Sequence, residues 1–233
     1  SERWHIWALD VDSGKTTQLT TGDTWNERRP VWSSDGAEIV FASNRAPDPD
    51  QEPDAIGLYA IPTRGGEFRE IPTPVGKTFG HTVSPDGVWV AYIGKEGSGD
   101  WWRNDHLWIV PLDGSDQPKC LTDDEDVCVG DMSISDMGEG GTSAPAWSSD
   151  SKSIYYQVSQ HGNTHLIALN IETKTRTEIV AGDGVVVGFT IDSRSALAAC
   201  LFSAPDDPGQ IRIINLSDRS QSQLSDLNRF LRE

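Results

Sequence analysis

The chain has 233 residues, of which 36% are hydrophobic, and this length is enough for one large all-β domain. It carries 36 Asp and Glu against 19 Lys and Arg, so its formal net charge is −17. A surface of this sign repels phosphate backbones and anionic lipids, so we expect neither nucleic acid nor a membrane as a partner. The three cysteines, Cys120, Cys128 and Cys200, lack metal-ligand spacing, so no disulfide framework, metal site or cofactor is expected.

The first predicted elements are two short strands, over Trp4–Leu9 and Thr17–Thr20, joined by a polar turn. They match the last two strands of the longer units that follow along the chain. Residues 1–22 are therefore expected to form half of such a unit.

From residue 24 onward a four-residue turn signal recurs, and it marks the first hairpin of each unit. Its aspartates are Asp35, Asp86, Asp150 and, in a degenerate copy, Asp192. Asp-Gly between two β-rich runs favours a tight hairpin, because glycine takes a positive φ without steric cost. Self-similarity at a period of roughly 40–50 residues, built from short strands, indicates a β-propeller.

Each repeat predicts four antiparallel strands, which make one propeller blade. The predicted blades cover residues 24–72, 76–122, 141–181 and 183–226. The predicted fold class is thus an all-β propeller, with about four and a half blades between residues 1 and 226. Such a piece leaves strand edges exposed, so we expect either further blades, in a ring of roughly seven, or the self-association of two copies.

The repeat resembles the TolB-like propeller repeat, whose apolar strand ends near an Asn-Arg pair, as in Phe41–Arg45. The second half is similar to the non-catalytic propeller of prolyl oligopeptidase family serine peptidases, in particular the acylaminoacyl-peptidase-like branch. The segments that carry this similarity are 129–136, 145–150 and 162–166. The ending, residues 223–231, looks like that family's exit from the last blade into an α/β-hydrolase domain.

This resemblance implies a propeller domain that gates access of short, in some cases N-acylated, peptides to the active site of a serine peptidase. The implied partners are an oligopeptide substrate and a C-terminal α/β-hydrolase domain of the same polypeptide. Residues 227–233 would begin the linker to that domain. Ser225 or Asp226 is predicted to cap a short helix whose Leu227, Phe230 and Leu231 share one apolar face.

The chain itself carries no catalytic signature, and we predict no catalytic residues in it. The family's nucleophile lies in a Gly-x-Ser-x-Gly elbow, and the nearest string here, Gly141–Pro145, lacks the final glycine. Hydrolysis by this chain alone is therefore not expected. The acidic segments 46–54 and 123–126 are predicted to be solvated connectors, with calcium binding by residues 46–54 as the alternative. The histidines lack ligand spacing and are expected to be structural.

One loop, Gly97–Asp105, is a candidate contact site. It is predicted as an inserted hairpin between the second and third strands of a blade, and it holds Trp101, Trp102 and Arg103. Stacking on the indoles and charge-assisted hydrogen bonds from the guanidinium could contact a substrate or the hydrolase domain. The alternative is that the two rings cover the core of their own blade.

Two other classes of function remain open at this level. One is a TolB-type propeller that acts as a protein-interaction scaffold without enzymatic activity. The other is a polysaccharide lyase built on similar repeats, which would need converging metal ligands. The expected compartment is the cytoplasm, with the periplasm as the alternative.

Overall fold

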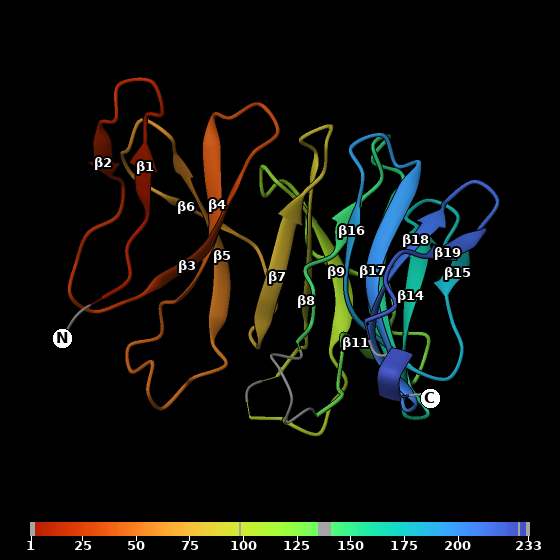
Figure 1. The fold of residues 1–233 in the computed structure, drawn as a ribbon. Coiled ribbons are helices and arrows are strands. Elements are labelled where there is room, and N and C mark those ends of the chain that lie inside the picture. Colours follow the sequence, from red (N-terminus) through yellow and green to blue (C-terminus); the bar gives the residue numbers. More distant parts are fainter. Residues whose placement is uncertain (1–2, 98, 135–140, 228, 232–233) are drawn as a thin grey trace. The chain divides into compact units, whose positions relative to one another are not determined.

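The computed structural model describes residues 3–97, 99–134, 141–227 and 229–231, and its regular structure is β-strand apart from one 3-10 turn (Figure 1). The predicted all-β class is thus confirmed. By contacts the chain divides into two compact units. The first is Ser1–Arg103 with Leu107–Cys120, and the second is Asn104–His106 with Leu121–Glu233.

The first unit holds a two-stranded sheet, one four-stranded antiparallel sheet and nearly all of a second. The small sheet pairs β1 (Trp7–Leu9) with β2 (Thr16–Gln18). The other two follow chain order, each strand pairing with the next: β3 (Glu27–Trp32), β4 (Glu38–Asn44), β5 (Ile56–Pro62) and β6 (Arg69–Ile71), then β7 (Thr78–Val83), β8 (Trp89–Gly94), β9 (His106–Pro111) and β10 (Lys119–Cys120). This order is that of meandering blades.

The second unit forms a nine-stranded sheet rather than two separate ones. Its strands are β11 (Cys128–Val129), β12 (Ala146–Trp147), β13 (Ser153–Gln160), β14 (Asn163–Asn170), β15 (Arg176–Val180), β16 (Val185–Ile191), β17 (Leu197–Ala204), β18 (Asp207–Asn215) and β19 (Gln221–Gln223). Two antiparallel groups are joined by one parallel pair, Thr164 with Val185. The Thr164 amide also donates to the Gly184 carbonyl at 3.0 Å, which extends this link.

The strand β11 was not predicted. It pairs with Val158 and Ser159 at one end of β13, while β12 pairs with Ile154 and Tyr155 nearer the other end. Two short strands, β11 and β12, thus pair with different parts of β13. The sequence signal was weak because two paired residues carry no recognisable alternation.

The recurrent turn is held by a serine and an aspartate acting together. Ser33 Oγ donates to Asp35 Oδ1 at 2.7 Å and accepts from the Glu38 amide at 2.9 Å. The Ala37 amide donates to the same Asp35 oxygen. The hydrogen bond from Ser33 lowers the pKa of the Asp35 carboxyl below its ordinary value. The same bonds recur at the turns that begin with Ser84 and Ser148.

The fourth copy of the turn corrects the sequence alignment. Asp192 was aligned with the turn aspartates, but it takes the place of the turn serine. Its amide donates to the Leu197 carbonyl, and its Oδ1 accepts from the amides of Ala196 and Leu197. Arg194 therefore stands where the other copies have aspartate, and one carboxylate replaces two side chains.

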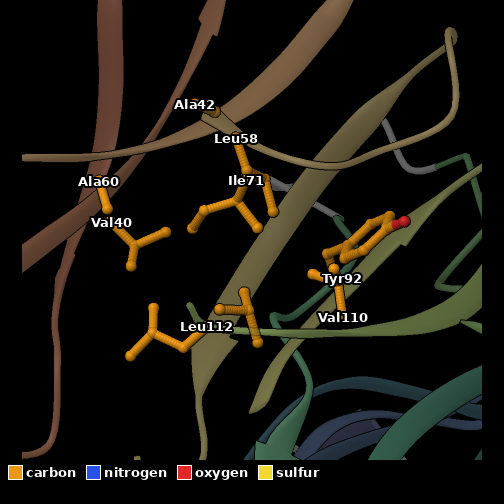
Figure 2. Packing of buried hydrophobic residues seen from close by; sticks show 9 residues of the cluster. Val40, Ala42, Leu58, Ala60, Ile71, Tyr92, Val110 and Leu112 are labelled. Atoms are coloured by element: carbon orange, nitrogen blue, oxygen red, sulfur yellow. The ribbon is translucent and has the colours of Figure 1, made fainter. Parts of the chain in front are cut away.

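A hydrophobic core of the first unit lies between its two four-stranded sheets. In the first unit, side chains from β4, β5 and β6 meet Tyr92 of β8, Val110 of β9 and Leu112 (Figure 2). Val40, Leu58 and Ile71 in this cluster are fully buried. Burial of such side chains contributes about 1.5–3 kcal/mol each, which makes this packing the main source of stability. A corresponding cluster in the second unit is built around Leu166, Val186 and Ile214.

The C-terminal segment differs from the predicted capped helix. The described residues Arg229–Leu231 form a single 3-10 turn. Ser225 does not cap it: its Oγ donates to Gln210 Oε1 at 2.7 Å and accepts from the Ile211 amide at 2.8 Å. The hydroxyl is thus used to fasten the chain to β18. The side chains of Leu224, Leu227 and Phe230 are exposed.

Candidate functional site

The predicted contact loop is part of the first unit as far as Arg103, and its two indoles are exposed. Trp101 is 82% and Trp102 66% exposed, and their rings meet edge to face with centroids 6.1 Å apart. Rings in this position do not cover the core of their own blade, so that alternative is wrong. Their predicted role as a contact with substrate or with another domain stays a prediction.

Backbone and ionic bonds hold this loop in shape. The Lys95 ammonium donates to the Asp100 carbonyl at 2.8 Å, and Arg103 Nε lies 2.9 Å from Asp100 Oδ2. The Gly97 amide donates to the Val75 carbonyl at 2.9 Å. The exposed pair of indoles is therefore presented on an anchored loop, although the Arg103 guanidinium is already paired with a carboxylate.

A second feature of the first unit was not predicted: a hollow of about 420 Å³ beside β3. Among the described residues, its lining includes three arginines, Arg3, Arg28 and Arg29, and a single carboxylate, Asp50. Trp25 and Phe79 contribute aromatic surface. The local charge is thus positive in a chain whose net charge is −17. Concave sites with apolar walls and a few convergent polar groups are typical of ligand binding.

Within the described part of the chain, Arg28 and Arg29 have no carboxylate within ion-pair distance. The Arg28 guanidinium lies 5.7 Å from the Trp4 ring centroid, and Arg3 Nε donates to the Asp23 carbonyl at 2.9 Å. The side chains of Arg28 and Arg29 are exposed. Their charges are therefore available to an anion that enters the hollow.

Arg29 has a left-handed backbone, with φ 55°. It lies in a β-bulge of β3, four residues before the turn serine Ser33. The residue four before Ser84 is Gly80, which lies in the corresponding bulge of β7 with φ 60°. One repeat thus places an arginine where the next uses glycine, although this region costs a non-glycine residue about 1–2 kcal/mol. Aligning the two repeats on their serines could have revealed this position.

The wall behind the hollow is fixed by a buried ionic network. Glu27, the first residue of β3, is buried and accepts from Arg45 at 2.6 Å, from Thr20 Oγ1 at 3.0 Å and from His5 Nδ1 at 2.8 Å. The Arg45 guanidinium also lies over the rings of Trp25, Tyr59 and Phe68. Arg45 therefore anchors the strand that carries Arg28 and Arg29.

Other titratable side chains are buried or bonded to the backbone. His81 is buried, and burial lowers its pKa to about 4. His106 Nδ1 lies 3.1 Å from the Thr122 carbonyl. Burial raises the pKa of the Cys200 thiol to about 11. Among the described residues, no group of three or more His, Cys, Asp or Glu side chains is placed to hold a metal ion. The same residues contain no helix long and apolar enough to cross a membrane.

No protein-family model matches the chain. A curated relative, an uncharacterized peptidase named YuxL from Bacillus subtilis (strain 168), is 33% identical over 99 residues. The match covers 41% of this chain and only 14% of the relative.

Solved structures of low sequence identity align with nearly the whole chain. A putative TolB from Agrobacterium tumefaciens has a TM-score of 0.65 at 17% identity over 94% of this chain. The fold is a β-propeller. Acylaminoacyl peptidase from Pyrococcus horikoshii has a TM-score of 0.66 at 18% identity over 97% of this chain, and an oligogalacturonate lyase in complex with manganese has a TM-score of 0.70 at 14% identity over 95%. This propeller spans 68% of the TolB chain, 59% of the lyase and 31% of the peptidase.

Proposed function

We propose that this propeller is the non-catalytic module of a serine peptidase and that it limits access of substrates to the active site. The observation that carries the proposal is the 33% identity to a curated peptidase, joined to the fold similarity with an acylaminoacyl peptidase of which the chain spans 31%. The remaining length of such an enzyme leaves room for a separate catalytic domain. The substrates would be short peptides, including N-acylated ones.

The physical basis of the gating is size. Sheets with cores as closely packed as the cluster around Leu58 do not deform to admit a folded protein. A rigid body of this kind over a hydrolytic site admits only short, flexible chains and shields the reaction from bulk water.

The contact with the catalytic domain is proposed for two exposed apolar groups. Leu224, Leu227 and Phe230 lie at the C-terminal end, where that domain would follow. Trp101 and Trp102, with Arg103, form the second group and would meet either that domain or the substrate. Aromatic and arginine side chains are enriched in such interfaces.

The second candidate is an interaction scaffold of the TolB type, favoured by the 68% of a TolB chain that the propeller spans. Fluorophosphonate labelling of the natural polypeptide that contains this segment separates the two. Under the peptidase proposal, a labelled polypeptide much larger than 25.5 kDa is expected. A natural polypeptide that contains this segment and takes no label would overturn the peptidase proposal and favour the scaffold.

A further inference from the structure

The arginine hollow beside β3 is the strongest unassigned feature of the chain. In the described part of the chain, its lining combines three guanidinium groups with a single carboxylate, in a protein with almost twice as many acidic as basic residues. In a chain with this excess of acidic residues, a cluster of arginines is not expected from composition alone. A positively charged hollow on an acidic surface concentrates anionic ligands at that place.

Arg29 gives the hollow its second, independent signal. Its left-handed backbone is strained, and the corresponding position in the next blade is filled by Gly80, which relieves that strain. Its side chain is exposed and has no ion-pair partner in the described part of the chain, so packing does not explain the choice of arginine. Strain that local packing does not explain is a pointer to a binding role.

We infer that this hollow binds the carboxylate of a peptide, with Arg28 and Arg29 as the groups that meet it. Guanidinium groups hold carboxylates through paired, charge-assisted hydrogen bonds. The apolar lining, which includes Trp25, Ile56 and Phe79, suits an adjacent apolar side chain better than a small inorganic anion. The inference rests on the proposed function in that the ligand is a peptide, and it adds the chemical group of the peptide that this domain recognises.

Calorimetric titration of the 233-residue chain with the tripeptide Ala-Ala-Phe, at fixed ionic strength, tests the inference. We expect binding of the free acid, and at least about tenfold weaker binding of its C-terminal amide. Ala-Glu-Phe amide distinguishes the two sources of the carboxylate. If it binds as well as the free acid, the hollow accepts a side-chain carboxylate; if not, it reads the C-terminus.

The variant Arg29→Gly removes the guanidinium and leaves the backbone in a conformation that glycine adopts freely. It should remain folded and bind the free acid about tenfold more weakly, as should Arg28→Gln. Arg64→Gln is the matched control, because Arg64 is exposed in the same unit and does not line the hollow. Its affinity should not change.

Equal binding of acid and amide, unchanged binding by Arg29→Gly, or equally strong binding of inorganic phosphate would overturn the inference. These measurements need no catalytic domain. If the chain binds the peptide acid but the natural polypeptide that contains it takes no fluorophosphonate label, the carboxylate site stands and the peptidase proposal fails.

Discussion

Asp192 occupies the place in its blade that Ser148 occupies in the blade before it. The amides of Asp192 and Ser148 donate across a hairpin to the carbonyls of Leu197 and Ser153 respectively. In return, the amides of Leu197 and Ser153 donate to a side-chain oxygen of Asp192 and Ser148. Ser148 needs Asp150 to complete its turn, whereas the Asp192 carboxylate takes both roles. The turn is thus conserved in geometry where it is lost in sequence.

The turn serine should be important for stability. Ser148→Ala leaves the Ser153 amide and the Asp150 carboxylate without their shared partner, and Ser148 is buried. We expect the free energy of unfolding to fall by about 1–2 kcal/mol in urea titrations. Ser193→Ala, an exposed serine in the fourth turn, is the control and should change it little. An equal effect of both variants would contradict this account of the turn.

Alignment of the fourth turn makes a related prediction. Asp192→Ala should lower the thermal midpoint more than Arg194→Ala, because the amides of Ala196 and Leu197 lose their acceptor only in the first variant. Differential scanning calorimetry of the two variants measures this directly. A larger fall of the thermal midpoint in Arg194→Ala would contradict this and would align Asp192 with Asp35 instead.

The two bulge residues should respond to substitution in opposite ways. Gly80→Ala places a side chain at φ 60° and should cost about 1 kcal/mol of unfolding free energy. Arg29→Gly relieves strain at φ 55° but gives the unfolded chain more freedom. Its free energy of unfolding should therefore stay the same or rise by up to about 1 kcal/mol. Chemical denaturation of both variants tests the pair. A marked loss of stability in Arg29→Gly would show that the arginine packs structurally.

Burial of His81 should make stability depend on pH. Its pKa is lowered from 6.5 to about 4, chiefly by burial, which the hydrogen bond to the Val40 carbonyl opposes. The unfolded chain therefore takes up this proton at a higher pH than the folded chain does. The contribution to unfolding free energy is full above about pH 6.5 and falls by about 3 kcal/mol as the pH drops to about 4.

Comparing unfolding at pH 7.5 and 4.5 in the wild type and in His81→Leu isolates this term, because the carboxylates contribute to both. The variant should lose less stability on acidification. His161→Gln, which changes an exposed histidine, should behave as the wild type. Identical pH dependence in all three proteins would rule out His81 as the source.

The thiols should differ in reactivity. Burial raises the pKa of Cys200 to about 11, so at neutral pH little of its nucleophilic thiolate is present. Cys120 and Cys128 are partly exposed. Alkylation with iodoacetamide followed by mass spectrometry should modify these two first and Cys200 only on unfolding. Early labelling of Cys200 in the folded chain would contradict its buried position.

Much of the fold could be predicted because its signals are local. The turns at Ser33 and Ser84 and the alternating strands beside them depend on neighbouring residues alone. The pair of Thr164 with Val185, the strand β11 and the use of Ser225 by β18 depend on contacts between distant segments. No pattern in a short window carries that information.

The candidate sites divide in the same way. The Trp101–Arg103 loop could be recognised from composition, since two adjacent indoles beside an arginine are unusual in a loop. The arginine hollow could not, because Arg3, Arg28 and Phe79 meet only after the strands have paired. Its one sequence signal, Arg29 opposite Gly80, needed the repeats to be aligned first.

The central claim, that this propeller restricts a peptidase to short substrates, is tested most directly by one comparison. The natural polypeptide that contains the segment is given a short peptide and a folded protein that displays the same sequence in a surface loop, and kcat/KM is measured for both. The account predicts hydrolysis of the free peptide and at least about a hundredfold slower cleavage of the displayed loop, a difference of about 2.7 kcal/mol in transition-state free energy. Equal rates for the two would contradict it.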